Sequence, residues 1–419
     1  MSLTMLLNSD TAPRAWRTVA LGDVAVIQTG IAKSKKPKSH AVRVSYLRVA
    51  NVQDGYVDLS DIKHIEVSPY EITRYRLQAG DVLFTEGGDF DKLGRGTVWR
   101  GQIDPCLHQN HVFAVRPYKG TLLPEFLAYV ASSQVGRQYF VSCSKQSTNL
   151  ASINSTQLKQ FLIPLPPLSE QRRIADILTT WDKTLSVLDH LIKHKRALLA
   201  SLRDGLVNRS DRFMRHEGRV GTKALKAFLH PVKRSIPRPQ EPYLALSLRS
   251  HGKGTFQRLV DHPEEVDMDT LYRVRGRDLI VNITFAWEGA IALAKAQDED
   301  CLVSHRFPTF EIDEAQVDRE FLGFAINDKR FFYHLGTASP GGAGRNRVLN
   351  QQDFLDIEIP FPTITVQHAI AGVLIDAERA IVALHAQRIA FAEQRDALVS
   401  EMLTGRLRVR DAERLAAAG

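Results

Sequence analysis

Two segments of the chain carry apolar residues at alternating spacings of three and four, the pattern of a long helix with one packed stripe. One stripe begins at Leu178 and the other at Leu374, and each continues over many turns. A stripe of this length needs a partner helix. Because the pattern predicts no third long helix, we expect the two segments to pack against each other. The expected packing residues are Leu178, Trp181, Leu185, Leu188, Ile192, Leu199 and Leu202 in the first segment, and Leu374, Ile381, Leu384, Phe391, Leu398 and Met402 in the second.

Ahead of each stripe the pattern changes to short runs of β-branched and aromatic residues that alternate with turn residues. The first such region ends with a helical stretch over 124–140 and a proline-containing strand over 161–165. The second repeats this plan, with a helical stretch over 320–335 and a strand over 357–361. This mixture of short strands and helices predicts two α+β domains.

The two regions are copies of one another. The stretch from Ile163 to Gln171 reads IPLPPLSEQ, and the stretch from Ile359 to Gln367 reads IPFPTITVQ. Upstream, residues 81–83 match residues 278–280 at nearly the same offset. A repeat this long is not a solenoid unit, which spans about 20 to 50 residues. The pattern therefore indicates two whole domains with pseudo-twofold symmetry.

The direction of the two helices follows from the linker after the first one. About a dozen residues lead into the second domain, too few to retrace a helix roughly 54 Å long, so the helices are predicted to be antiparallel. Ser169 and Thr365 are residue types that cap helix N-termini, and we expect them to start the two helices. The predicted fold is α+β, with two pseudo-twofold-related domains separated by a long antiparallel two-helix coiled coil. The predicted segments are 1–168 and 209–364 for the domains, 169–208 and 365–407 for the helices, and 408–419 for a tail.

Composition places the chain among ordinary globular proteins. Hydrophobic residues make up 44% and charged residues 24% of the sequence. Its three cysteines are Cys106, Cys143 and Cys301, an odd number spread far apart, which favours free thiols in a reducing compartment. Neither a leader segment nor an apolar stretch of membrane-spanning length is visible, so a cytoplasmic location is expected.

The charge is basic, at +8 with a pI near 9.3, which fits a polyanionic partner but is also reached by many soluble proteins. Local clusters are more informative. Residues 30–48 contain only basic charges, and a second basic segment at 233–238 lies at the corresponding place of the second region. A single run of this kind is explained equally well by a solvated loop or by a segment that follows phosphates. Its occurrence in both regions favours phosphate binding.

The stretch from Ile163 to Gln171, followed by Ile174, Ala175 and Leu178, closely resembles the specificity subunits of type I restriction-modification systems. The resemblance includes the second copy, the strand at 81–84 and the segment at 403–407, and it covers nearly the whole chain. The second copy departs from the pattern at Thr363 and Val366, but it retains Pro360, Pro362 and Gln367.

This resemblance implies a DNA-reading subunit that is not catalytic by itself. Each target-recognition domain would read one half of a split, asymmetric site on double-stranded DNA, and the helices would set the unread gap. The implied partners are two methyltransferase subunits that methylate adenine, and restriction subunits that translocate and cleave DNA. No cofactor is expected on this chain; S-adenosylmethionine, ATP and Mg²⁺ are expected on the partner subunits.

Sequence motifs of the enzyme alternatives are not found. An adenine methyltransferase needs an Asn- or Asp-Pro-Pro-aromatic corner, but the only Pro-Pro pair, Pro166-Pro167, precedes Leu168. The glycine-rich stretches at 252–255 and 341–344 do not have the spacing of a phosphate loop. The residues at 106–111 include one cysteine and two histidines suitable for zinc, but a fourth ligand is not visible. Buried packing is therefore the favoured interpretation of this segment, and no metal site is predicted.

Base contacts require Arg, Lys, Asn or Gln side chains held over a groove edge, whereas phosphate contacts require only cations and backbone amides. Turn-rich stretches of each domain offer these groups, although solvated turns would show the same composition. The predicted DNA-contacting residues are Lys33, Lys35, Lys36, Lys38, Lys92, Arg95, Gln109, Asn110, His111, Lys145, Gln146 and Asn149 in the first domain, and Lys233, Arg234, Arg238, Trp287, His305, Arg306, Arg345, Asn346 and Arg347 in the second.

Two alternatives remain. The chain could be a duplicated, helix-spaced adaptor that binds proteins and has no DNA specificity, which predicts no salt-dependent DNA affinity. It could also be a standalone restriction or modification enzyme with an unrecognised active site, which predicts that the isolated chain binds the methyl donor.

Overall fold

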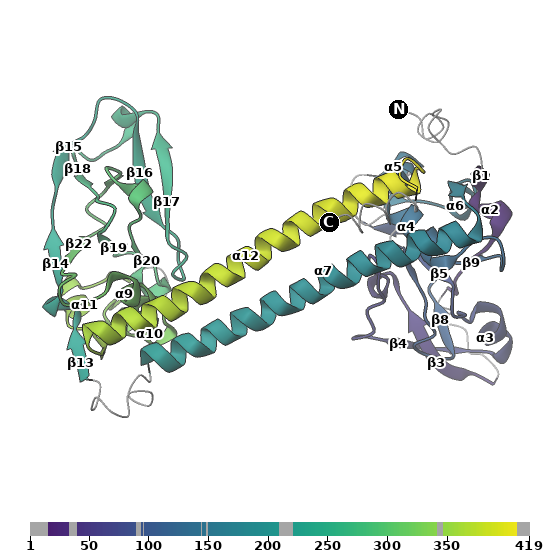
Figure 1. Cartoon of the computed structure of the whole chain (residues 1–419), viewed down its shortest axis with the longest axis horizontal. Coiled ribbons are helices and arrows are strands. Elements are labelled where there is room, and N and C mark those ends of the chain that lie inside the picture. Colours follow the sequence, from purple (N-terminus) through teal and green to yellow (C-terminus); the bar gives the residue numbers. More distant parts are fainter. Residues whose placement is uncertain are drawn as a thin grey trace. The chain divides into compact units, whose positions relative to one another are not determined.

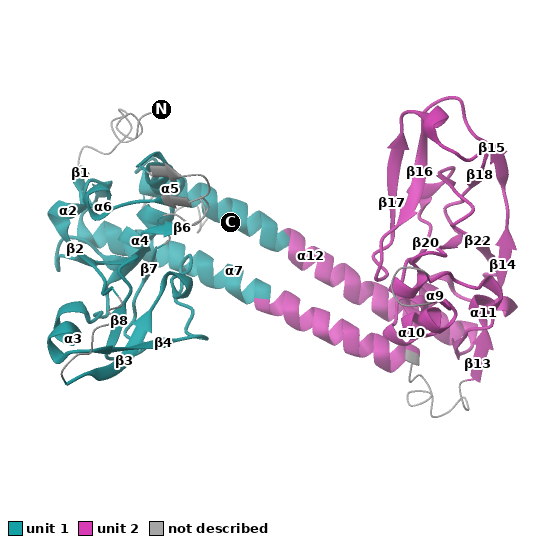
Figure 2. Cartoon of the chain, turned by 180° about the vertical axis from the view of Figure 1, so that it is seen from behind, with its two compact units in different colours: residues 1–189, 387–419 teal, residues 190–386 magenta. Residues whose placement is uncertain are grey.

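The structure, a computed structural model, describes residues 16–32, 40–88, 94, 96–143, 145–147, 150–208, 221–341 and 347–408. The chain forms two compact units, shown in different colours in Figure 2. Unit 1 comprises Met1–Asp189 and Gln387–Gly419, and unit 2 comprises His190–Ala386. Each long helix is therefore shared between the units, and each unit is built from both helices.

The body of unit 1 has a mixed α+β architecture. A four-stranded sheet has the order β2-β9-β5-β7, and a three-stranded sheet has the order β4-β3-β8 with β3 and β8 parallel. Its elements are β1 (Arg17–Ala20), α2 (Leu21–Val24), β2 (Ala25–Thr29), β3 (Val42–Leu47), β4 (Lys63–Val67), α3 (Pro69–Tyr75), β5 (Val82–Thr85), β6 (Gly87–Gly88), β7 (Gly96–Val98), β8 (Cys106–His108), β9 (Val112–Pro117), α4 (Pro124–Ser132), α5 (Gln134–Cys143), β10 (Lys145–Ser147), β11 (Leu150–Ser152), α6 (Ser155–Lys159) and β12 (Leu162–Leu165).

Unit 2 repeats the four-stranded sheet and the parallel strand pair, which confirms the predicted duplication, but its second sheet has five strands in the order β15-β18-β21-β16-β17. Its four-stranded sheet has the order β14-β22-β19-β20, and β16 and β21 form the parallel pair. In each unit the first strand pairs with the last, as β1 with β12 and β13 with β23. The elements are β13 (Gly221–Ala224), β14 (Leu229–Val232), β15 (Ser235–Pro237), β16 (Tyr243–Leu248), β17 (Thr255–Val260), β18 (Thr270–Arg273), β19 (Leu279–Val281), β20 (Ile291–Leu293), β21 (Leu302–Val303), β22 (Thr309–Ile312), α9 (Arg319–Ile326), α10 (Lys329–Thr337), α11 (Gln351–Leu355) and β23 (Glu358–Phe361).

The two long helices are α7 (Leu168–Arg203) and α12 (Ile364–Leu403), which run alongside each other in Figure 1. They are antiparallel, as predicted, because Asp182 pairs with Arg395 and Asp189 pairs with Arg388. The rings of Trp181 and Phe391 meet edge to face, with centroids 5.6 Å apart. All the residues expected in the apolar stripes are buried or half-buried.

A buried glutamine attaches each globular body to its helix. The Gln171 side chain is fully buried; its Oε1 accepts from the Leu123 amide at 2.9 Å, and its Nε2 donates to the Thr121 and Pro166 carbonyls at 3.0 and 2.8 Å. In unit 2, Gln367 is also fully buried, accepting from the Asp318 amide at 2.9 Å and donating to the Pro362 carbonyl at 2.8 Å. These contacts explain why the repeated motif ends in glutamine, since this side chain both accepts and donates.

The predicted N-terminal caps of the two long helices are wrong. The helices begin at Leu168 and Ile364, so Ser169 and Thr365 lie inside the first turn and are not caps. The carbonyl oxygens of Pro167 and Thr363 accept the first helical bonds instead.

The helical stretches predicted over 124–140 and 320–335 are each broken in two. Ser133 ends α4, and its Oγ accepts from the Gly136 amide, so that it caps α5. Asp328 similarly caps α10 through the Arg330 amide. Local side-chain caps therefore override a continuous apolar pattern at both places.

Each unit has its own main apolar core, and both long helices contribute to it. In unit 1, Phe126 and Val130 of α4 pack with Leu178 of α7 and with Val399 and Met402 of α12. The core of unit 2 likewise includes Phe321 and Leu322 of α9 with Leu374 of α12. No helix within the described ranges combines the length and apolar character needed to cross a membrane.

Candidate nucleic-acid interface

In unit 1, three turn segments meet at a single residue that follows strand β5. The Glu86 amide donates to the His111 carbonyl at 2.9 Å, and the Glu86 carbonyl accepts from the Ile153 amide at 2.8 Å. This junction joins the end of β5, the turn before β9 and the segment that follows β11. One of the predicted DNA-contacting stretches, 109–111, belongs to these turns. Strand β10 (Lys145–Ser147), which contains two further predicted residues, pairs with β11 directly before the joined segment.

Unit 2 builds the same junction from different residues. The Ile283 amide donates to the Arg306 carbonyl at 3.0 Å, and the Ile283 carbonyl accepts from the Leu349 amide at 2.8 Å. The junction joins the end of β19, the turn before β22 and the segment before α11. The predicted residues Trp287, His305, Arg306 and Arg347 belong to these segments. The two units therefore share a backbone frame that presents unrelated side chains.

The unit 1 junction presents polar, partly acidic groups. The His111 Nδ1 lies 2.6 Å from the Glu86 carboxylate, and its Nε2 lies 3.2 Å from the Asn110 amide nitrogen. Both His111 and Glu86 are accessible to solvent, with side chains 53% and 30% exposed. The residue Gln109 is half-buried and forms a β-bridge with Ile31, which lies at the start of the predicted basic segment.

The unit 2 junction presents aromatic and cationic groups. The Arg347 guanidinium lies over the Trp287 ring, 5.7 Å from its centroid. Phe285 is 38% exposed, and His305 and Arg306 are also exposed. Arginine stacked on an aromatic ring is held in a geometry suited to planar recognition of a base edge or a phosphate.

A short turn holds these aromatic residues in place. The 3-10 turn η6 (Ala286–Glu288) ends at Gly289, whose φ of 75° lies in the left-handed region that favours glycine. The carbonyls of Glu288 and Gly289 accept from the amides of His251 and Gly252. The Glu288 carboxylate also accepts from the Ser250 hydroxyl at 2.8 Å. The exposed Phe285 and the half-buried Trp287 are thus supported from a neighbouring loop.

The predicted basic residues at 233–238 differ in their surroundings. Lys233 is exposed, whereas Arg234 pairs at 2.5 Å with Asp278, whose side chain is 3% exposed. Arg238 donates to the Val266 carbonyl. Arg234 therefore has a structural role in the fold, and Lys233 is the more available cation.

Unit 1 has an equivalent buried aspartate, but the arginine that pairs with it comes from a different strand. Asp81, which matches Asp278 in the repeat, pairs with Arg116 of β9 at 2.7 Å. Sequence comparison of the two copies locates the aspartates but not the arginines, because the cation comes from β9 in one copy and follows β14 in the other.

Several predicted contact residues lie outside the described part of the chain. The backbone of β10 pairs with β11, but the side chains of Lys145 and Gln146 are outside the description. The residues outside it entirely are Lys33, Lys35, Lys36, Lys38, Lys92, Arg95, Asn149, Arg345 and Asn346. Glu86 was not predicted, and its pairing with His111 could not be inferred from their separation in the sequence.

The histidine and cysteine near the unit 1 junction are packing residues. His108 is fully buried, its Nδ1 lies 2.7 Å from the Val112 carbonyl, and burial lowers its pKa to about 4. Burial also raises the pKa of the Cys106 thiol to about 12, so the thiol remains protonated. Among the described residues, no group of three or more His, Cys, Asp or Glu side chains has the arrangement of a metal site.

Comparisons with known proteins agree with this architecture. The model of the type I restriction modification DNA specificity domain matches residues 13–194 and 277–394. The chain therefore belongs to the type I restriction-modification DNA specificity family. Membership makes it the specificity subunit of such a system and not one of its catalytic subunits.

Particular relatives cover nearly all or part of the chain. It is 26% identical to a specificity subunit assigned to the type I restriction enzyme MjaX of Methanocaldococcus jannaschii, over 95% of each chain. It is 32% identical to the EcoKI specificity subunit of Escherichia coli, over 34% of this chain and 31% of that one. The crystal structure of the HsdS subunit from Thermoanaerobacter tengcongensis has the same fold, with a TM-score of 0.55 and 17% identity over 94% of this chain and 98% of that chain.

Proposed function

We propose that each unit reads one half of a bipartite, asymmetric target on double-stranded DNA, and that the paired helices α7 and α12 set the length of the unread gap. The observation that carries this proposal is the repeated junction. The same two backbone hydrogen bonds form this frame in both units, but it bears Glu86, Asn110 and His111 in one unit and Trp287, Arg306 and Arg347 in the other, which suits the reading of two different sequences.

In this proposal, partner subunits catalyse the methylation and the cleavage of DNA. Two methyltransferase subunits would methylate adenine in the target, and restriction subunits would cleave DNA. S-adenosylmethionine, ATP and Mg²⁺ would bind to those partners, and the complex would act in the cytoplasm. The helix faces that point away from the packed stripes carry exposed charges suited to docking the methyltransferase subunits. These charged residues are Arg172, Arg173, Asp176, Lys183, Glu378 and Arg379.

The decisive experiment is co-expression of this chain with its methyltransferase partner, followed by single-molecule mapping of adenine methylation in the host DNA. A split, asymmetric motif with one fixed gap is the expected result. A stable complex that methylates no such motif would refute two-site reading.

The protein-binding adaptor is tested separately by DNA affinity at several salt concentrations. The proposed function predicts that affinity of the complex for DNA falls steeply as salt rises, because cations on the protein replace counterions on the phosphates. A salt-independent or undetectable affinity would favour the adaptor instead.

A further inference from the structure

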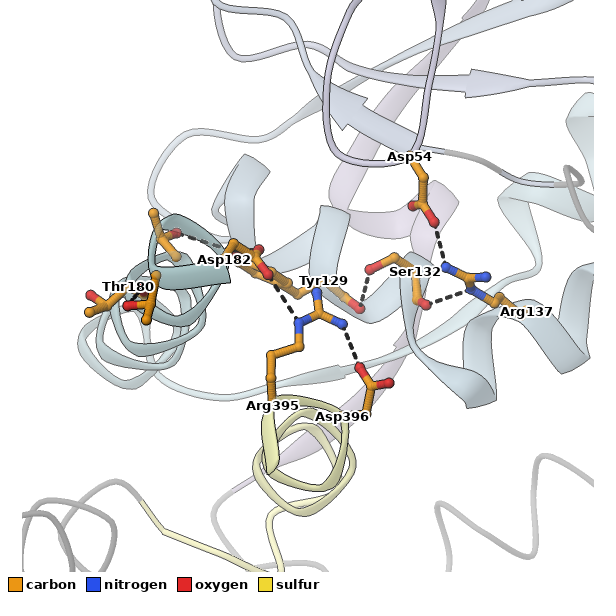
Figure 3. A network of polar contacts seen from close by, with 10 residues as sticks. Asp54, Tyr129, Ser132, Arg137, Thr180, Asp182, Arg395 and Asp396 are labelled. Carbon is orange, nitrogen blue, oxygen red and sulfur yellow. Dashed lines mark hydrogen bonds and ion pairs between the residues drawn. The ribbon is translucent and has the colours of Figure 1, made fainter. Parts of the chain in front are cut away.

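Besides the hydrogen bonds of Gln171, two further contacts hold the body of unit 1 on the helix pair. The first is the apolar core, where Phe126 and Val130 of α4 pack near Leu178 and Met402. The second is polar and lies about one turn further along α7. There Tyr129 donates its hydroxyl to Asp182 at 2.7 Å, and Arg395 of α12 donates to the same carboxylate at 3.0 Å. Figure 3 shows Tyr129 and Arg395 converging on Asp182 from the body and from α12.

The polar contact continues into the body. The Ser132 hydroxyl donates to the Tyr129 carbonyl, and the Arg137 side chain donates to the Ser132 carbonyl at 2.9 Å and to Asp54 at 2.5 Å (Figure 3). The network thus runs from a loop that follows β3, through the junction of α4 and α5, to both long helices. Burial, followed by the adjacent Asp182, raises the pKa of Tyr129, so the phenol keeps its proton and remains the donor.

A cavity of about 750 Å³ lies beside this network, lined by residues of the body and of both helices. Its lining includes Thr97 and Ala128 from the body, Thr179 and Ser186 from α7, and Arg395 from α12. Close apolar packing therefore does not fill this region. The Tyr129 hydroxyl makes the direct hydrogen bond from the body to the Asp182 carboxylate, which Arg395 of α12 also contacts. Apolar contacts are non-directional, whereas a hydrogen bond weakens steeply when its angle changes.

Unit 2 differs at the equivalent position. Phe126 and Leu127 of α4 match Phe321 and Leu322 of α9 in the repeat, which places Phe324 where unit 1 has Tyr129. Phe324 packs at the edge of the unit 2 core and has no hydroxyl to donate. The hydrogen bond to the helix carboxylate is therefore a property of unit 1 alone at this position.

We propose that Tyr129 is a positioning residue, which fixes the angle at which the first recognition body is held on the helix pair through the carboxylate of Asp182. This inference rests on the proposed function, because the angle acts on the spacing between the two half-sites that the complex accepts. Loss of the hydroxyl loosens the angle without changing any residue at the junction that presents side chains to DNA.

The test uses the complex of the full chain with its methyltransferase subunits. Methylation is measured on a plasmid set in which the gap of the wild-type target is kept, shortened by one base pair or lengthened by one. In Tyr129→Phe, we expect methylation at the altered gaps, relative to the native gap, to rise about five- to tenfold. Base preferences within both half-sites should stay as in the wild type.

The matched control is Tyr139→Phe, which removes another hydroxyl bond of 2.7 Å, from Tyr139 to the Gln157 carbonyl, without touching the helices. It should keep the wild-type gap selectivity. Asp182→Ser, which removes the shared acceptor, should relax the gap at least as much as Tyr129→Phe.

The outcomes separate the two proposals. If the wild type methylates a split motif with one gap and Tyr129→Phe keeps the same gap selectivity, the positioning role is wrong and the proposed function stands. The positioning role is equally wrong if Tyr139→Phe relaxes the gap as much. If the wild type shows no split motif at all, both proposals fall.

Discussion

Replacing Gln171 with leucine should loosen the attachment of the unit 1 body to α7. Leucine fills a similar volume but leaves the Leu123 amide and the Thr121 and Pro166 carbonyls without their partner. A buried backbone group that loses its hydrogen bond costs about 1 kcal/mol or more, so the local cost is about 3 kcal/mol. An opening equilibrium that involves this site should rise on the order of 100-fold.

Hydrogen exchange measured by mass spectrometry is the appropriate assay, because a chain with two units need not unfold in one step. The peptide containing the Leu123 amide should exchange faster in Gln171→Leu, whereas the peptide containing Asp318 should be unchanged. The matched variant is Gln367→Leu, which loses two bonds in unit 2, at a cost of about 2 kcal/mol. Its effect should appear at Asp318 and not at Leu123.

The result that would refute this reasoning is equal exchange in the variants and the wild type at both peptides. That outcome would mean that water replaces the side chain at no cost. A uniform increase throughout both units in either variant would also contradict a local attachment, because it would indicate global destabilisation.

Burial lowers the pKa of His108 to about 4, from about 6.5 in the unfolded chain, so the unfolded chain binds a proton at a higher pH than the folded one. The stability of unit 1 against unfolding should therefore fall by up to about 3 kcal/mol as the pH falls from 6.5 to 4. Urea unfolding should show a smaller pH dependence in His108→Phe than in the wild type. Arg347→Ala should weaken recognition at the half-site read by unit 2 about 5- to 100-fold and spare the other half-site, which methylation mapping would reveal; equal loss at both would contradict separate readers. Gly30→Ala should destabilise unit 1 in thermal unfolding, since its Cβ would lie 2.1 Å from the His108 carbonyl oxygen, whereas Gly372→Ala, with open space at its Cβ, should not.

The long helices and the duplication were predictable because each leaves a periodic signal. Leu178 and Leu374 start apolar stripes whose period is that of a helix. The proline-containing motifs at 163–171 and 359–367 show that the same segment occurs at the end of both domains. The interruption at Ser133 was not predictable from the period, because its apolar neighbours continue the pattern and a side-chain cap decides the break.

The candidate interface was only partly predictable for a similar reason. Trp287 and Arg347 were recognised separately as suitable residue types, but their stacking depends on a junction at Ile283 between segments distant in sequence. In the sequence, Arg234 cannot be distinguished from an exposed cation that binds phosphate. In the structure, it forms a salt bridge with the buried Asp278. Residue type therefore suggested chemistry, and only tertiary pairing showed which groups are free to use it.

The last turns of α12 have a consequence for synthesis of the protein. Val399, Met402 and Leu403 belong to the same buried cluster as Leu21 and Val24, near the opposite end of the chain. The body of unit 1 therefore lacks part of its core until Val399, Met402 and Leu403 have been synthesised, whereas unit 2, although it follows along the chain, has all its residues by Ala386. A premature stop codon shortly before Val399 would damage the body made first and spare the one made second.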